Sequence, residues 1–220
     1  MSLIIFLSIG TAAMLFMGLL RKRKYNFSTM KTVIVTLCLT VTGVWGTRIL
    51  FKIESGAWGG QSYFGAVLFV PLLFAALAPV LRISYGRLMD FCAPAECAML
   101  AIMKIDCVLS GCCNGRVLFY TEQGQAICFP SQLIEAVNAI VVMSLLLWLE
   151  HTGKHQNRGY SWYLLLYGGT RFALNTLRSE LKSFVWILPS GHFWALLCVI
   201  AGAAGLLLIP VGKDTAVEKM

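Results

Sequence analysis

The feature that most constrains this chain is a series of apolar runs, each long enough to cross a lipid bilayer as a helix. A transmembrane helix needs about 20 mostly apolar residues, and only a helix or a closed barrel satisfies every backbone polar group in lipid. Seven runs meet this requirement, at residues 3–20, 32–51, 63–82, 91–109, 132–149, 160–177 and 185–210. The sequence therefore predicts an all-α integral membrane protein with about seven transmembrane helices in a single membrane domain over 1–220.

The composition agrees with a membrane location. Hydrophobic residues make up 58% of the chain and charged residues 13%, whereas a soluble domain has about a quarter of its residues charged. The net charge is +8, but the cations lie in short loops, and no phosphate-binding glycine loop or nucleic-acid-binding motif is present. We therefore expect a membrane and no nucleic acid as partner. Because Arg21-Lys22-Arg23-Lys24 follows the first apolar run rather than preceding it, we predict a retained helix and not a cleaved signal.

The orientation is predicted from the loop cations, which collect on the cytoplasmic side of membrane proteins. With the N-terminus outside, eleven cations are cytoplasmic: Arg21, Lys22, Arg23, Lys24, Lys31, Arg82, Arg87, Lys154, Arg158, Lys213 and Lys219. Four are external: Lys52, Arg116, Arg178 and Lys182. We therefore predict an N-out and C-in topology, with glycine-rich external loops at 52–62 and 110–131 around a polar intramembrane cavity.

Several charged residues fall inside or at the edge of the apolar runs, among them Arg171, Lys104, Asp106 and Glu135. A charge at the bilayer centre costs about 2.5–3.5 kcal/mol on insertion scales, so such groups usually face a cavity or a partner. One interpretation is a polar cavity that binds an anionic lipid head group; the other is internal salt bridges that fix helix packing. Because cations outnumber the nearby acids, and arginine binds phosphate through two parallel donors, we favour the first.

The cysteines and His192 leave more than one interpretation open. Cys107, Cys112, Cys113 and Cys128 lie close in sequence but lack the spacing of a zinc ribbon or a redox Cys-x-x-Cys pair. We favour a packing role, with a disulfide such as Cys113–Cys128 or a metal or catalytic site as alternatives, and we predict no metal and no cofactor. His192 is either a general base or a hydrogen-bonded packing residue.

The middle of the chain resembles the signature of the bacterial prolipoprotein diacylglyceryl transferases. The resemblance begins at Asp90-Phe91-Cys92-Ala93-Pro94 and continues to Gly111-Cys112-Cys113-Asn114-Gly115-Arg116-Val117. Further segments resemble the family's motifs in the same order: Gly43 to Arg48, Gly59 to Gly65, Pro130 to Glu135, Tyr167 to Phe172 with Arg178, and Ser190-Gly191-His192. The resemblance extends from about residue 43 to residue 205, and it implies the same seven-helix, N-out topology.

The resemblance implies an activity in the bacterial inner membrane. The family moves the diacylglyceryl group of phosphatidylglycerol, an anionic phospholipid, to the lipobox cysteine thiol of a secreted prolipoprotein precursor, without a metal or soluble cofactor. The predicted catalytic residues are Arg171, Lys104, His192 and Asp106. The predicted substrate-binding residues are Arg116, Gly111, Gly115, Glu135, Arg178, Gln132, Tyr63 and Asn175. Among them, Arg171 and Arg116 would bind the phosphate, while Asp90 and Pro94 would be structural.

The chain departs from the family's pattern at positions that handle charge and protons. Lys104 and Asp106 replace an arginine and a glycine, Phe64 replaces a histidine or tyrosine, Asn175 replaces a glutamate, and Phe129 replaces a histidine. These departures keep two other functions open: a divergent homologue that transfers a phospholipid-derived group to a different acceptor, and a non-catalytic lipid-binding membrane protein. A transporter and a thiol-redox protein are more distant alternatives.

Overall fold

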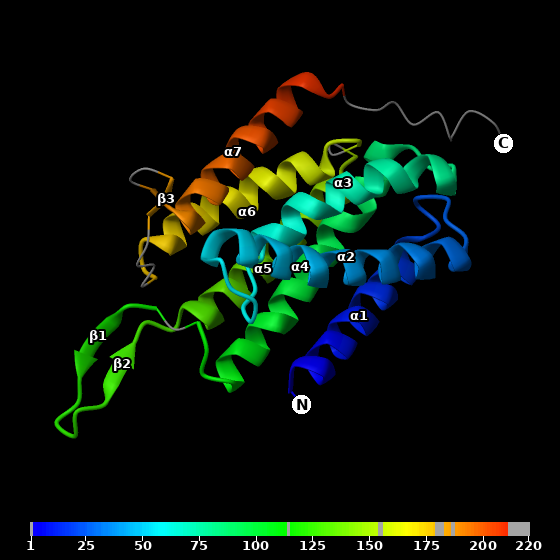
Figure 1. The fold of residues 1–220 in the computed structure, drawn as a ribbon. Coiled ribbons are helices and arrows are strands. Elements are labelled where there is room, and N and C mark those ends of the chain that lie inside the picture. Colours follow the sequence, from blue (N-terminus) through cyan, green and yellow to red (C-terminus); the bar gives the residue numbers. More distant parts are fainter. Residues whose placement is uncertain (1, 114, 154–155, 179–182, 186–187, 211–220) are drawn as a thin grey trace.

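The computed structural model describes residues 2–113, 115–153, 156–178, 183–185 and 188–210 of the 220-residue chain. Asn114, Lys154, His155, Lys182, Lys213 and Lys219 lie outside the described residues. Over the described ranges the chain forms seven helices with two short strand pairs (Figure 1). The helices are α1 Ser2–Arg21, α2 Thr29–Ser55, α3 Phe64–Leu81, α4 Tyr85–Leu109, α5 Ser131–His151, α6 Gly159–Asn175 and α7 Ser190–Leu208.

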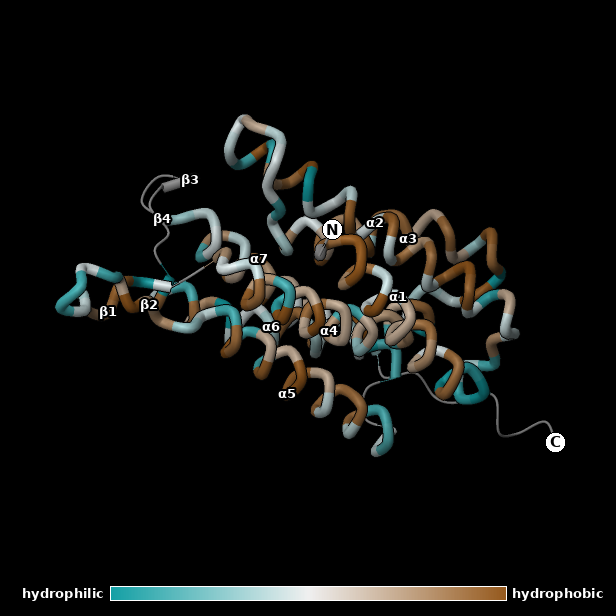
Figure 2. Tube along the Cα trace, turned by 90° about the horizontal axis from the view of Figure 1, so that it is seen from below, coloured by the Kyte–Doolittle hydropathy of each residue, from teal (hydrophilic) through white to brown (hydrophobic). Residues whose placement is uncertain are grey.

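Five of these helices, namely α1, α2, α3, α5 and α7, are long and apolar enough to cross a bilayer. The exceptions are α4, which carries Glu96, Lys104 and Asp106, and α6, which has 17 residues and carries Arg171. Apolar residues run along most of the helices, as the brown segments of Figure 2 show. The helices confirm the predicted helical membrane architecture, while seven spans and the N-out orientation stay predictions.

The helices bring two groups of charged residues to opposite ends of the bundle. At one end, the guanidinium of Arg21 at the end of α1 contacts Glu150 at the end of α5 at 2.7 Å and donates to the carbonyl of Phe91 near the start of α4 at 2.8 Å. There Asp90 accepts hydrogen bonds from the backbone N–H groups of Asn157 and Gly159, both at 2.6 Å. The end of α4, the start of α5 and the end of α6 therefore share the opposite end of the bundle.

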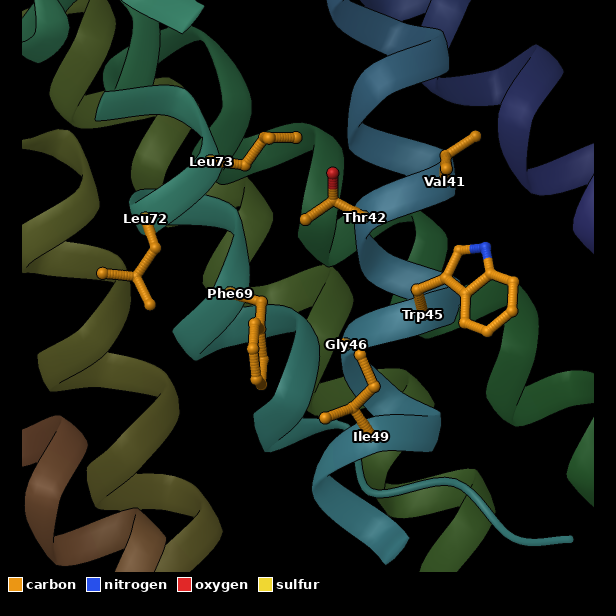
Figure 3. Close-up of a pocket in the computed structure, with 8 residues that line it drawn as sticks. All are labelled: Val41, Thr42, Trp45, Gly46, Ile49, Phe69, Leu72 and Leu73. Atoms are coloured by element: carbon orange, nitrogen blue, oxygen red, sulfur yellow. The ribbon is translucent and has the colours of Figure 1, made fainter. Parts of the chain in front are cut away.

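Helices α2 and α3 approach each other closely through two glycines. A methyl group at Gly46 would lie 2.7 Å from the carbonyl oxygen of Gly65, which is closer than side-chain carbons come in folded proteins. Small residues allow this kind of backbone approach between membrane helices. Beside the contact, residues of both helices line an apolar groove of about 420 Å³ (Figure 3). The groove is lined by Val41, Thr42, Trp45, Gly46, Ile49, Phe69, Leu72 and Leu73.

The predicted external loop 110–131 contains a strand pair that the sequence interpretation missed. Strands β1 (Val117–Tyr120) and β2 (Ala126–Cys128) pair antiparallel, with Tyr120 opposite Ala126. Gly124 in the connecting turn has φ of 78°, a conformation that favours glycine. The hairpin projects away from the helices at the lower left of Figure 1.

The seventh helix begins later than predicted. The run 185–210 was expected to be helical throughout, but residues 183–185 (β3) and Leu188–Pro189 (β4) form a short strand pair instead, and α7 begins at Ser190. Proline disfavours the helical conformation of the residue before it. Pro189 therefore separates the strand from the helix.

Candidate active site

Glu135 lies near the start of α5 at the centre of a buried cluster of charges. The ammonium of Lys104, from α4, lies 2.5 Å from its Oε2 atom. Arg178, three residues beyond α6, lies 2.6 Å from Oε1 through Nη1, and Nη1 of Arg171, from α6, also contacts Oε1. Lys104, Glu135 and Arg171 are buried. One carboxylate therefore holds three cations from separate parts of the chain in one place.

Among the described residues, the cations of this cluster outnumber its carboxylates. Asp106 is the other buried acid nearby in the chain, two residues after Lys104, and it accepts a hydrogen bond from the Ser110 hydroxyl at 3.4 Å. Three cations and two carboxylates sum to a formal charge of +1. Buried charges are costly unless they are paired. A phosphodiester carries one negative charge, which equals the excess of cations over carboxylates in the described part of the cluster.

Aromatic side chains at the start of α3 lie beside Arg171. The guanidinium carbon of Arg171 lies 6.0 Å from the centre of the Phe64 ring, within the range of a cation–π contact. The neighbouring Tyr63 donates to or accepts from the hydroxyl of Tyr163 at 3.0 Å, and its ring meets that of Tyr167 edge-on at 5.4 Å. Phe64 thus covers one side of the arginine, and Tyr63 joins the start of α3 to the tyrosines of α6.

Asn175 lies four residues after Arg171 on α6, which places both on one face of the helix. Its side chain is 1% exposed, and neither its Nδ2 nor its Oδ1 atom has a hydrogen-bond partner among the described residues. Most buried polar side-chain atoms have a partner in the protein or an ordered water. This amide can therefore serve a polar ligand or a water that enters beside the cluster.

The loop after α4 is held against α5 and Arg178. The amide of Gln132 donates to the carbonyl of Cys112 at 2.6 Å. Gly115 pairs with Arg178 as an isolated antiparallel bridge, and the guanidinium Nε of Arg116 donates to the carbonyl of Arg178 at 3.3 Å. Gly111, Gly115, Arg116 and Gln132 therefore lie at the same end of the bundle as the charge cluster, and the Arg116 side chain is exposed.

His192 lies apart from this group. It occupies the first turn of α7, where its ring meets Phe172 edge-on with ring centres 5.1 Å apart. Its Nδ1 atom is buried, and no hydrogen bond or ion pair joins it to the Glu135 cluster within the part of the chain that the structure describes. Its predicted role as a general base stays a prediction.

The structure brings together three of the four cysteines that the sequence analysis considered as a group. The sulfur atoms of Cys107, Cys112 and Cys113 lie within 4.8 Å of one another. Cys113 and Cys128 are both free, so the disulfide considered between them does not form in this structure. A hydrogen bond with Cys107 and the charges of Lys104 and Arg178 lower the pKa of the Cys113 thiol to about 5, against the opposing effect of partial burial.

Comparison with known proteins shows the family to which the chain belongs. The family described as prolipoprotein diacylglyceryl transferase matches residues 1–208. The phosphatidylglycerol–prolipoprotein diacylglyceryl transferase 2 of Clostridium perfringens is 23% identical over 94% of this chain and 88% of its own length. The phosphatidylglycerol–prolipoprotein diacylglyceryl transferase of Teredinibacter turnerae is 30% identical over 66% of this chain and 54% of its own. The chain therefore belongs to the prolipoprotein diacylglyceryl transferase family.

Proposed function

We propose that this protein transfers the diacylglyceryl group of phosphatidylglycerol to the lipobox cysteine thiol of a secreted prolipoprotein. The observation that carries the proposal is the buried cluster around Glu135, in which Lys104, Arg171 and Arg178 outnumber the carboxylates among the described residues. The relatives from Clostridium perfringens and Teredinibacter turnerae are named for this reaction. The site would lie at the outer face of the bacterial inner membrane, where a secreted precursor is available.

In this proposal Lys104 and Arg171 bind the phosphate of the lipid. Glu135 keeps their charged ends close together before the lipid arrives, so no reorganisation is needed when charge develops on the leaving group. Asn175 donates to or accepts from a hydroxyl of the head group, which satisfies its buried amide. Arg116, which is exposed beside Arg178, contacts the part of the head group nearest water.

The chemical step replaces a carbon–oxygen bond with a carbon–sulfur bond. The acceptor thiol loses its proton because the thiolate is the nucleophile. The thiolate attacks the carbon of the diacylated glycerol that is bonded to the phosphate oxygen, and a thioether forms. Glycerol phosphate leaves with the bonding electrons of the broken C–O bond. We assign the acceptance of the thiol proton to Asp106, the second buried carboxylate at this end of the bundle.

The test is transfer of labelled lipid to a lipobox peptide by the purified protein in phosphatidylglycerol nanodiscs. Arg171→Ala should abolish labelling, and Lys104→Met should reduce it strongly, because each change removes a phosphate-binding charge. Arg158→Ala is the matched control, since Arg158 lies at the other end of the same helix and donates to the carbonyl of Ile209. Labelling that survives Arg171→Ala would remove this arginine from the reaction.

The residues around Arg171 support an alternative function, in which the acceptor is a molecule other than a lipobox cysteine. Phe64, which covers the guanidinium, and Asn175 stand where the resemblance places a protonatable residue and an acid. A divergent enzyme would consume phosphatidylglycerol and release glycerol phosphate without labelling the lipobox peptide. Measuring both products in one reaction separates the two functions, and a pure lipid-binding protein would give neither product.

A further inference from the structure

We propose that Cys107, Cys112 and Cys113 form a binding site for a soft, thiophilic metal ion, for which Cu(I) is the probe. The three sulfur atoms lie within 4.8 Å of one another at the end of α4. This spacing allows one ion to contact all three sulfurs at once. The proposal concerns thiols outside the predicted lipid-binding set, and it stands or falls independently of the transferase activity.

The backbone explains why two of these cysteines meet. Helix α4 ends with the backbone N–H of Cys112 bonded to the carbonyl of Cys107 at 3.1 Å and that of Gly111 bonded to Val108 at 3.3 Å. Gly111 has φ of 65°, so the three features make a Schellman motif. In this motif the residue two positions after the helix cap packs against the residue three positions inside the helix. Cys112 and Cys107 occupy those two positions.

The third cysteine is held in place by its backbone. Cys113 has φ of 60°, a left-handed conformation that costs a residue other than glycine energy and often marks a functional position. The hydroxyl of Ser131 donates to its carbonyl at 2.8 Å, and Gln132 donates to that of Cys112 at 2.6 Å. The first turn of α5 thus anchors the segment that carries two of the three thiols, which lowers the ordering needed to bind an ion.

The ligand set and its charge favour a soft ion that accepts three sulfurs. Structural zinc sites use four ligands, whereas thiolates without nitrogen or oxygen partners suit Cu(I). Three thiolates and one Cu(I) carry a charge of −2. Lys104 acts electrostatically on all three thiols and Arg178 on Cys113, so these two cations offset part of that charge.

The test is an anaerobic titration of the reduced full-length protein, in detergent, with Cu(I) buffered by a chromophoric chelator. We expect about one tightly bound Cu(I) per chain, with an X-ray absorption spectrum that reports three sulfur neighbours. The double variant Cys112→Ser/Cys113→Ser should lose the tightly bound Cu(I). The matched control Cys38→Ser/Cys128→Ser removes two half-buried thiols outside the cluster and should retain it.

Three results would overturn the proposal. The first is equal Cu(I) binding by the Cys112→Ser/Cys113→Ser protein. The second is an absorption spectrum with fewer than three sulfur neighbours. The third is an absence of tight Cu(I) binding by the fully reduced protein. Thermal unfolding of both double variants shows whether the comparison is made between folded proteins.

Discussion

At the scale of single residues, Glu135 connects structure and function. It contacts cations from α4, from α6 and from the segment after α6, so it joins the two helices that do not meet the length and hydropathy of a membrane span. The resemblance places Glu135 among the predicted substrate-binding residues, and that role stays a prediction. Its central place among three cations depends on how the helices pack, which spacing along one chain does not reveal.

Replacing Glu135 with glutamine should destabilise the protein and abolish transfer. The amide keeps the shape of the side chain but leaves three neighbouring cations without their shared carboxylate. Losing one partner of a buried ion pair typically costs about 3–5 kcal/mol. Thermal unfolding in detergent measures the loss, with Glu122→Gln in the exposed turn of the hairpin as control. Equal unfolding temperatures for the two variants would show that the cluster is not held by Glu135.

The lowered pKa of Cys113 predicts a thiol that stays reactive in mild acid. A thiolate is the species that iodoacetamide alkylates, and an exposed thiol with an ordinary pKa of about 8.5 loses about tenfold in rate for each pH unit below it. Because the pKa of Cys113 is lowered, its alkylation rate should change little between pH 8 and pH 6.5. Mass spectrometry of the Cys113 peptide measures the rate. A tenfold fall across this interval would contradict the charge environment described for the thiol.

At the scale of helices and strands, the sequence predicts most of the helices and few of the connections. Apolar length alone places the helices, because lipid requires each spanning segment to satisfy its own backbone. The β1–β2 hairpin was missed although the run Val117–Tyr120 is rich in strand-forming residues and is followed by a turn glycine, Gly124. For the thiol cluster, Gly111 indicates a helix end that brings Cys112 to Cys107. The approach of Cys113 depends on contacts with the first turn of α5, which the sequence does not reveal.

The contact between α2 and α3 gives a prediction at this scale. Gly65→Val should lower stability by about 1–3 kcal/mol, because an added side chain at Gly65 overlaps the backbone of Gly46 and forces the helices apart. Gly169→Val on α6 is the matched control, since a side chain there meets nothing within 4 Å. Chemical unfolding in mixed micelles compares the two. An equal effect of both substitutions would mean that helix propensity, and not packing, decides the result.

At the scale of the whole molecule, the Arg21–Glu150 group and the Glu135 cluster lie at opposite ends of the bundle. They differ in the ratio of cations to carboxylates. Arg21 is paired with Glu150 and bonded to backbone carbonyls, which suits a structural role in packing α1, α4 and α5. In the Glu135 cluster, three cations face two carboxylates among the residues that the structure describes. The loop-cation bias predicts that the Arg21 end faces the cytoplasm and that the Glu135 cluster lies at the outer face, where both substrates of the proposed reaction would be accessible.

This topology predicts which thiols react from outside the cell. A maleimide that cannot cross membranes should label Cys112, which is exposed at the end of α4, in intact cells. In a protein that also carries Arg23→Cys, the new thiol, in the exposed turn after α1, should be labelled only after the membrane is opened. The reverse pattern of labelling would invert the predicted orientation and move the site to the cytoplasmic face.

The most direct measurement of the central claim is a cryo-electron microscopy map of the protein in nanodiscs of phosphatidylglycerol. We predict an ordered head group whose phosphate oxygens lie within hydrogen-bonding distance, about 2.7–3.2 Å, of Lys104 and Arg171. Arg116 should lie on the side of the head group that faces water. Lipid phosphate ordered only elsewhere, with Glu135 and other protein groups fully occupying both cations, would contradict a lipid-phosphate site at this cluster.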